Sequence, residues 1–319
     1  MRKISAKSMS FQKFLLNYGL YAAMVATIFV FAYLNSNYLT FGNVLNIFEQ
    51  SAYYMVCAMG MTFVLISKEV DLSVGGMLAA LTVLGGFIMK DTGSVSKALM
   101  VMLGAAVVLG LFNGICVVIL KLPSFIATIA TGYIVRGLAG FYTDGAAVSG
   151  FPAAFTKFAW QKVMGMPVLL VIAVAMLIIT VYVLNFTAFG RTVFSCGANK
   201  KATKLMGVRI NIVCIAVFVI SAICTCVGAV MVMTRSGVAR FSTLPDLQMQ
   251  CIAAAVIGGT SLTGGKGNLV GTVVGVLLFS LVQSGLNALG VLSFWQEIFT
   301  GAIIIMATVL DSAKTRSNV

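Results

Sequence analysis

Residues 258–267 read G-G-T-S-L-T-G-G-K-G, a run of glycines, hydroxyls and one lysine in an otherwise apolar chain. A phosphate-binding loop of this kind needs the pattern G-x-x-x-x-G-K-[ST] between a strand and a helix. Here Thr260 stands where the first glycine is required, and Gly267 stands where the magnesium-binding hydroxyl is required. The residues before the loop, C-I-A-A-A-V-I, have the composition of a membrane span. The stretch therefore predicts a tight turn between two membrane helices, not a nucleotide-binding α/β fold.

The composition of the whole chain agrees with a membrane environment. Of its 319 residues, 60% are hydrophobic and only 9% are charged, whereas soluble domains carry about 25% charged residues. So few charged side chains cannot coat the surface of a soluble protein of this length, and lipid is therefore the solvent for most of the chain. The sequence predicts an all-α polytopic membrane protein with a single transmembrane domain over residues 1–319.

Apolar segments predict about ten membrane helices, because a spanning helix needs about 20 mostly apolar residues. An even number places both termini on the same side, and the positive-inside rule decides which side that is. With both termini cytoplasmic, basic residues of the inner segments outnumber those of the outer segments by fourteen to six. The predicted segments are 14–35, 46–67, 72–90, 98–120, 123–141, 166–186, 210–232, 249–262, 268–289 and 294–311.

Several function classes are excluded by residues that the chain lacks or spaces wrongly. It contains no histidine, which removes Ser–His catalysis, histidine metal ligands and histidine proton relays. Its seven cysteines form no C-x-x-C pair and lie mostly in apolar runs, so they predict neither a metal site nor a disulfide framework. The net charge of +13 indicates basic loops beside anionic membrane lipid, and we expect no nucleic-acid partner.

Two carboxylates lie in the stretch K-E-V-D-L-S-V-G-G at 68–76, between the second and third predicted spans. Asp71 or Ser73 is expected to cap the third helix, because a helix N-terminus favours side-chain acceptors and negative charge. A proton-coupling role for Glu69 and Asp71 is the alternative, since carboxylates in membranes are often functional.

Glycines are expected to shape the turn at 258–267 and the helix that follows it. Gly264, Gly265 and Gly267 are predicted to be structural turn residues, because glycine adopts positive φ without steric cost. Gly267, Gly271 and Gly275 also form a ridge of small residues, which lets two helices approach closely in lipid. We expect this ridge to serve helix packing and not to bind a ligand.

The longest predicted inner loop covers residues 187–209 and contains the polar stretch A-N-K-K-A-T-K-L-M-G. This stretch has helical propensity, with Asn199 or Ser195 as the N-cap and Gly207 as the terminating glycine. A short basic helix on the cytoplasmic face is either a solvated surface or a docking element for a cytoplasmic partner.

Four stretches of the chain are G-M-T-F-V-L-I-S-K-E-V-D-L-S-V-G-G at 60–76, F-N-G-I-C-V-V-I-L-K-L-P-S-F-I-A-T-I-A-T at 112–131 with R-G-L at 136–138, F-G-R-T-V-F-S-C-G-A-N-K-K-A-T-K-L-M-G-V at 189–208, and I-G-G-T-S-L-T-G-G-K-G at 257–267. Taken together and in this order, they resemble the ribose-type family of ABC importer permeases. The resemblance covers nearly the whole chain, from about residue 40 to Asp311. Glu69 departs from the family pattern, in which a small or neutral residue is expected, and it is expected to pair with Lys68 or to reach the basic inner surface.

The resemblance implies a sugar-importing permease subunit, without enzymatic activity of its own, in a bacterial inner membrane. It implies three kinds of protein partner: a second copy of the permease or a homologue, a cytoplasmic ATPase that binds ATP and magnesium, and an extracytoplasmic sugar-binding protein. No cofactor is expected in this chain itself. By similarity, the loop that meets the ATPase contains Arg191, Gly197, Asn199, Ala202 and Gly207.

The fourth-to-fifth segment offers a candidate substrate path. Pro123 and nearby glycines interrupt the helical pattern, and interrupted helices are tolerated where they line a cavity. Phe125, Thr128 and Thr131 would supply an aromatic face and hydroxyls, with ordinary helix packing as the alternative. Arg136 is expected to face protein, water or headgroups. A transporter driven by an ion gradient is the alternative function, although the acidic residues lie at span ends or in loops.

Overall fold

The computed structural model describes the backbone of residues 6–317 and the side chains of residues 19–306, 308 and 309. The described chain is mostly helical, as the sequence predicts. Three short helices are α6 (Ala153–Phe158), α8 (Ala188–Ala198) and α9 (Lys200–Leu205). The other helices each overlap one predicted span: α1 (Ala6–Leu34), α2 (Phe41–Ile66), α3 (Val74–Thr92), α4 (Val95–Val118), α5 (Ser124–Thr143), α7 (Val168–Phe186), α10 (Ile210–Ser236), α11 (Leu247–Ile257), α12 (Leu269–Ala288) and α13 (Ser293–Ser317).

The predicted number of ten spans is not confirmed by the lengths and hydropathies of these helices. Within the described part of the chain, six helices are long and apolar enough to cross a membrane: α3, α4, α5, α7, α10 and α12. Helix α11 has only 11 residues, and the first half of α2 is polar. The predicted orientation of the termini depends partly on Arg2 and Lys3, which lie outside the described residues.

Helix α2 lies at the centre of the packing, which explains how it can be less apolar than a lipid-facing span. Every residue from Met55 to Ile66 is buried, and α2 packs against α7, α10, α11 and α12. Polar side chains on a helix that protein surrounds can find partners within the protein. The second half of α2 is therefore surrounded by other helices of the protein and not by lipid.

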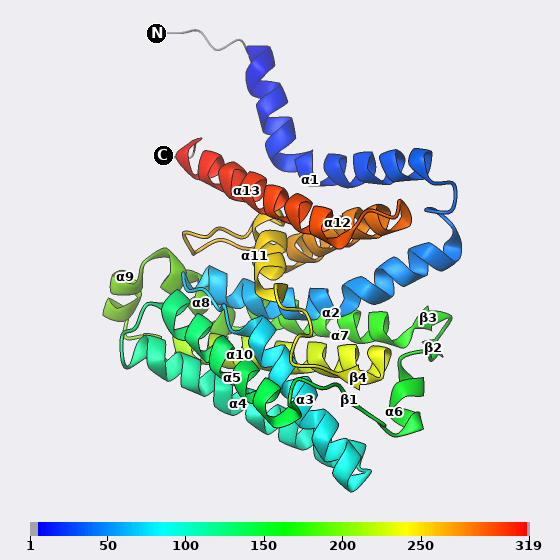
Figure 1. The fold of residues 1–319 in the computed structure, drawn as a ribbon. Coiled ribbons are helices and arrows are strands. Elements are labelled where there is room, and N and C mark those ends of the chain that lie inside the picture. Colours follow the sequence, from blue (N-terminus) through cyan, green and yellow to red (C-terminus); the bar gives the residue numbers. More distant parts are fainter. Residues whose placement is uncertain (1–5, 318–319) are drawn as a thin grey trace.

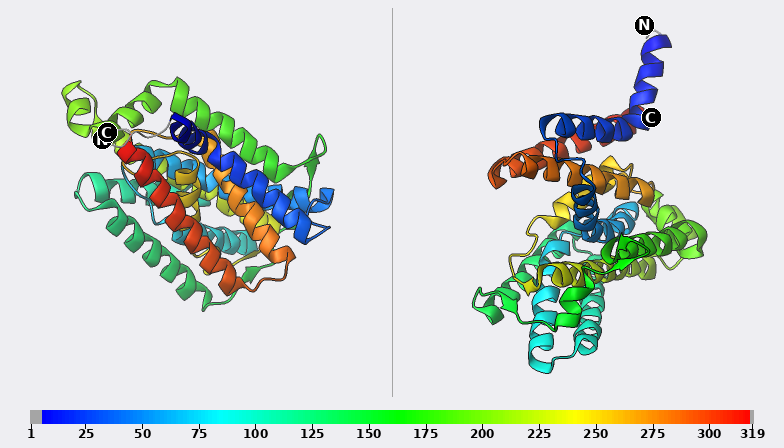
Figure 2. Two further views of the ribbon diagram at one scale, coloured as in Figure 1. Left: turned by 90° about the horizontal axis from the view of Figure 1, so that it is seen from above. Right: turned by 90° about the vertical axis from the view of Figure 1, so that its right-hand side faces the viewer.

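The long helices run side by side in stacked layers, with α1 and α13 at one edge and α3, α4 and α5 towards the other (Figure 1). The right-hand view of Figure 2 shows the same layering from the side. Helices α8 and α9 and the turn between α11 and α12 lie at the left-hand end of Figure 1. Helix α6 and the strands β2 (Lys162–Val163) and β3 (Met166–Pro167) lie at the opposite end.

Two pairs of very short strands close this opposite end. β1 (Val148–Ser149) pairs antiparallel with β4 (Val238–Ala239), and β2 (Lys162–Val163) pairs with β3 (Met166–Pro167). With both termini cytoplasmic, the predicted spans leave residues 142–165 and 233–248 as outer loops, and the first strand pair connects these two segments. The two predicted outer loops therefore meet at one end of the helices, away from α8 and α9.

The glycine ridge of α12 packs against α11, as predicted. A Cβ atom at Gly271 would lie 1.9 Å from the carbonyl oxygen of Gly258, and one at Gly275 would lie 2.2 Å from the carbonyl oxygen of Ala254. Only glycine allows the two backbones to approach so closely. The short helix α11 is thus held against α12 by main-chain contact.

Candidate functional site

The predicted inner loop folds into two short helices, each with a side-chain cap. Thr187 caps α8 by accepting a hydrogen bond from the backbone N–H of Gly190 at 3.2 Å. Asn199 caps α9 by accepting one from the N–H of Ala202 at 3.0 Å, as the sequence predicts for this residue. Gly207 follows the last turn of α9 with a φ of 79°, the left-handed conformation that ends helices.

Gly197, near the end of α8, lies directly against the ends of two other elements. A Cβ atom there would lie 1.7 Å from the carbonyl oxygen of Ile66 and 2.5 Å from the backbone nitrogen of Gly265. These two groups are themselves joined, because the N–H of Gly265 donates to the carbonyl of Ile66 at 2.8 Å. Gly197 therefore packs on a main-chain hydrogen bond that links the end of α2 to the glycine turn.

Two of the three glycines predicted to shape the turn between α11 and α12 have a positive φ, and Gly267 does not. Gly264 and Gly265 have φ values of 82° and 74°, and the N–H of Ser261 donates to the carbonyl of Lys266 at 3.1 Å. A Cβ atom at Gly267 would lie 2.4 Å from Cγ1 of Ile66. The turn is thus shaped by contact with the end of α2, and this role for its glycines is structural.

An ion pair joins α9 to the junction between α2 and α3. The ammonium group of Lys200 donates a hydrogen bond to Oε1 of Glu69, and the side chains are 41% and 13% exposed, respectively. Glu69 thus reaches the basic inner loop, one of its two predicted alternatives. Burial by itself lowers the pKa of Lys200, but the hydrogen bond and charge of Glu69 outweigh it, so that the pKa of Lys200 is raised.

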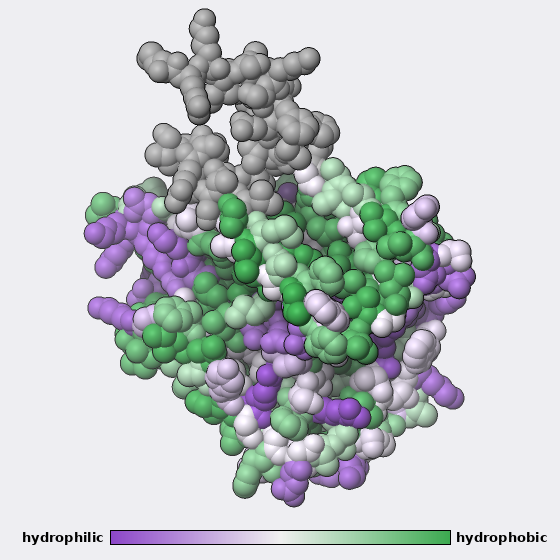
Figure 3. All heavy atoms as spheres, turned by 45° about the horizontal axis from the view of Figure 1, so that its top comes forward, coloured by the Kyte–Doolittle hydropathy of each residue, from purple (hydrophilic) through white to green (hydrophobic). Residues whose placement is uncertain are grey.

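The outer face of α8 and α9 is free of contacts with the rest of the described chain and is partly apolar. Arg191 and Ala202 are exposed, and Leu205 and Met206 are 89% and 68% exposed. Figure 3 shows hydrophilic residues gathered at this left-hand end, while hydrophobic residues dominate the middle of the visible face. Two bare apolar side chains among lysines form a suitable surface for another protein.

Asp71 is buried at the α2–α3 junction and organises a polar network. Its Oδ1 accepts hydrogen bonds from the N–H of Ser73 at 3.0 Å and from the Ser73 hydroxyl at 2.5 Å, and its Oδ2 accepts one from the Ser221 hydroxyl at 2.8 Å. Asn113 donates to the Ser73 hydroxyl at 2.9 Å. Ser73 occupies the N-cap position of α3, but its side chain makes no capping bond. Asp71 therefore joins α3 to α4 and α10.

The threonines of the candidate substrate path are engaged with backbone groups. The Thr128 hydroxyl accepts a hydrogen bond from the N–H of Leu72 at 2.9 Å and donates to the carbonyl of Ser124 at 2.7 Å. The Thr131 hydroxyl donates to the carbonyl of Ala127 at 2.9 Å, while Phe125 is exposed. The start of α5 is thus tied to the α2–α3 junction, next to the Asp71 network.

Arg136 of α5 faces protein, one of the environments predicted for it. Its Nη2 atom donates a hydrogen bond to the carbonyl of Pro245 at 3.3 Å. The contact ties α5 to the segment that precedes α11. The guanidinium thus reaches the backbone of a neighbouring loop through Nη2, while its buried Nε has no hydrogen-bond partner within the described part of the chain.

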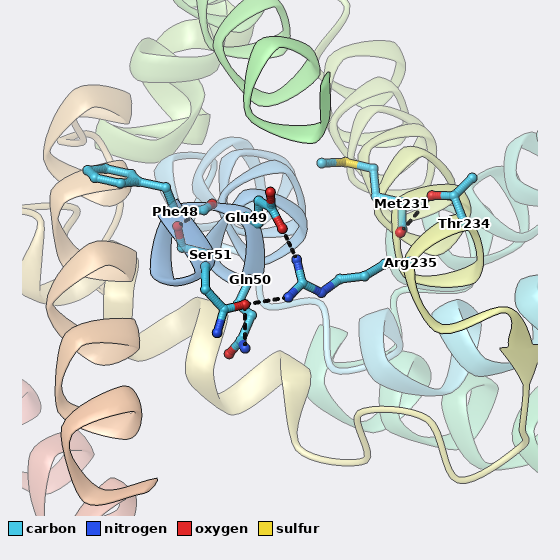
Figure 4. Close-up of polar contacts among 8 residues, drawn as sticks. Phe48, Glu49, Gln50, Ser51, Met231, Thr234 and Arg235 are labelled. Atoms are coloured by element: carbon cyan, nitrogen blue, oxygen red, sulfur yellow. Dashed lines mark hydrogen bonds and ion pairs between the residues drawn. The ribbon is translucent and has the colours of Figure 1, made fainter. Parts of the chain in front are cut away.

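A second polar cluster, which the sequence analysis missed, lies near the opposite end of the helices. Arg235 of α10 pairs with Glu49 of α2 at 2.7 Å and donates to the amide oxygen of Asn46 at 2.6 Å. Figure 4 shows Glu49 and Arg235 pointing toward one another from the two helices. The Arg235 guanidinium lies 5.8 Å from the ring centroid of Trp160. A glutamate in the first turn of a predicted span was the available signal, because such a charge needs a partner.

Comparison with protein families identifies the family to which this chain belongs. A family model described as a branched-chain amino acid transport system / permease component matches residues 43–308. The chain belongs to this family of transport permeases. The matched region contains the α2–α3 junction, the α8–α9 pair and the glycine turn, so the contacts described above lie within the family domain. No solved structure matches this permease significantly.

Individual relatives are similar to the permease over nearly its whole length. The ribose import permease protein RbsC of Escherichia coli K12 is 32% identical over 298 residues, which cover 92% of each chain. RbsC of Bacillus subtilis is 33% identical over 302 residues, or 93% of each chain. The galactose/methyl galactoside import permease protein MglC of E. coli K12 is 31% identical over 324 aligned positions, which cover 96% of each chain.

Proposed function

We propose that the chain is the membrane-spanning permease subunit of an ATP-driven importer for a monosaccharide or a related small polar solute. The relatives named above are import permeases for ribose and galactosides, and another is named a probable ABC transporter permease protein. The family is of the ABC permease type, which decides against the ion-gradient-driven transporter considered as the alternative. The description of the family model names amino acids, but these relatives all favour a sugar.

The observation that carries this proposal is the contact of Gly197 with Ile66 and Gly265. A displacement of α8 and α9 is transmitted to the end of α2 and to the glycine turn through backbone atoms. These atoms cannot move out of the way as flexible side chains do. Helix α2 is the central helix of the core. A partner that binds the exposed face of α9 can therefore move the core helices by displacing one small unit.

This function implies an arrangement of the whole assembly. We infer that all ten of the helices that overlap predicted spans serve the transmembrane domain, with both termini and α9 on the cytoplasmic side of a bacterial inner membrane. ATP and magnesium bind to a cytoplasmic ATPase, and the permease supplies the path. A second copy or a homologue completes that path, and an extracytoplasmic binding protein delivers the solute at the end formed by α6, β2 and β3.

Affinity purification from the native cell, in mild detergent, tests the proposal. We expect an ATPase to co-purify with the tagged permease, and Leu205→Asp with Met206→Asp to abolish that association while leaving the permease in the membrane. Reconstituted complexes should then import labelled D-ribose or D-galactose only with ATP. Uptake that persists without ATP and follows an ion gradient would overturn the proposal.

A further inference from the structure

Two small cavities lie side by side among α2, α11, α12 and α13, away from the α8–α9 end. Both are lined by Gln250, Phe279 and Gln283. Tyr54 and Ser280 add two hydroxyl groups to the lining of the first cavity. Each cavity has room for roughly one water molecule. The lining is rich in amides and hydroxyls, although these helices belong to a largely apolar chain.

The two glutamines have unused hydrogen-bonding capacity. Within the described part of the chain, the side-chain amides of Gln250 and Gln283 have no hydrogen-bond partner. Gln250 is half-buried, and Gln283 is exposed well inside α12. An amide placed against hydrocarbon without a hydrogen-bond partner is strongly disfavoured, because it loses its hydrogen bonds to water and gains none. This face of α12 therefore meets water, solute or protein rather than lipid.

Polar residues continue from the cavities toward the end that carries α6, β2 and β3. Asn46, Gln50 and Tyr54 are spaced four residues apart and therefore share one face of α2. Asn46 lies in the cluster with Glu49 and Arg235 shown in Figure 4. The polar face of α2 thus runs from this outer cluster to the first cavity.

We propose that Gln250 and Gln283 form a transient binding subsite for a polyhydroxylated solute on its way through the permease. The inference rests on the proposed import function. An amide offers both a donor and an acceptor, which suits a hydroxyl that needs both, and Phe279 offers an apolar ring to the C–H face of a sugar. Because the cavities hold only water-sized molecules in this conformation, α2, α11 and α12 must separate to admit the solute, as alternating access requires.

Uptake measurements test the subsite directly. We expect Gln250→Leu and Gln283→Leu, singly, to lower ATP-driven uptake of labelled D-ribose and D-galactose about tenfold, equivalent to about 1.4 kcal/mol. Both variants should still bind the ATPase and hydrolyse ATP, since the α8–α9 unit is unchanged. Tyr182→Phe removes a polar group from the exposed face of α7, lines neither cavity and should leave uptake unchanged. Wild-type uptake in both glutamine variants would overturn the inference.

Cysteine labelling separates this inference from the proposed substrate class. The native cysteines are all buried, so Gln283→Cys should be the main site of reaction with a charged thiosulfonate reagent, and D-ribose with ATP should slow the reaction. If the wild-type complex imports neither sugar, the sugar assignment fails, and labelling of Gln283→Cys by the charged reagent still supports a water-filled path. An unreactive cysteine, or one that only cross-links two copies of the permease, would overturn the inference.

Discussion

Single glycines determine how closely the elements of this permease approach one another. At Gly197 the atoms that a methyl group would meet are the backbone oxygen of Ile66 and the backbone nitrogen of Gly265. Neither can rotate away, so any larger residue must displace α8 as a whole. Gly197 therefore determines how rigidly the α8–α9 pair is linked to the core.

Gly197→Ala is expected to weaken the fold and to uncouple the permease from its ATPase. Overpacking of this kind costs about 1–3 kcal/mol, which a thermal unfolding assay of the detergent-purified permease detects. ATP-driven uptake should fall further than stability alone explains. Gly137→Ala is the matched control, because a Cβ atom there meets nothing within 4 Å. Equal effects of the two substitutions would contradict the assigned role of Gly197.

Asp71 gives a second prediction at this scale, because the sequence leaves open whether it caps a helix or couples protons. Its observed partners, Ser73 and Ser221, are hydroxyl and amide donors, which indicates a structural role. Asp71→Asn should keep much of the transport, whereas Asp71→Leu should lose it, since buried donors then lack acceptors at about 1–3 kcal/mol each. Uptake by vesicles that contain the wild type or either variant, with and without a proton ionophore, measures these effects on transport. Dependence of the wild type, but not of Asp71→Asn, on the proton gradient would restore the coupling role.

At the scale of elements, α9 is held to the core by one ion pair as well as by the contact of Gly197. The Glu69–Lys200 pair is partly exposed, so its coupling energy should be only about 0.2–1 kcal/mol. Its main contribution is to fix the orientation of α9 against the α2–α3 junction.

A double-mutant cycle with Glu69→Gln and Lys200→Met should measure this small coupling energy in the unfolding of the purified permease. The charge-reversed pair Glu69→Lys with Lys200→Glu should recover uptake that each single reversal loses. Because the pKa of Lys200 is raised, the stability that this lysine contributes to the fold is fully present below its unfolded-state pKa. It is lost only as the pH rises through the raised value, well above neutral. No recovery in the reversed pair would show that the two residues act independently.

For the whole molecule, the two ends of the helix stack differ in structure and in predicted side. The end with α8 and α9 carries the exposed face that we propose docks the ATPase, and the end with α6, β2 and β3 carries Met164, which is 94% exposed. Alternating access requires that these ends face opposite compartments.

Cysteines placed at the two ends should be labelled from opposite sides of the membrane. We expect Met164→Cys to react with an impermeant maleimide in intact spheroplasts, and Lys201→Cys to react only after the membrane is opened. The native cysteines are buried, so the background should be low. Labelling of Lys201→Cys in intact spheroplasts would invert the predicted orientation.

Much of the candidate site follows from local sequence. Asn199 caps α9 and Gly207 follows its end, because capping depends on residues within one turn. The glycine ridge of α12 is also evident from its spacing. The capping role predicted for Asp71 omits its hydrogen bond to Ser221, which is 150 residues away in the chain. No local pattern contains that partner.

The sequence by itself determined that this protein is helical and membrane-embedded, where its helices lie, and which turns need glycine. These properties depend on composition and on residues close together in the chain. Only the tertiary structure decided that α2 is central, that Glu69 pairs with Lys200, 131 residues away, and that Glu49 pairs with Arg235, 186 residues away. It also brought Gln250 and Gln283 to one pair of cavities. Such contacts depend on how whole helices pack, and hydropathy alone does not specify which faces meet.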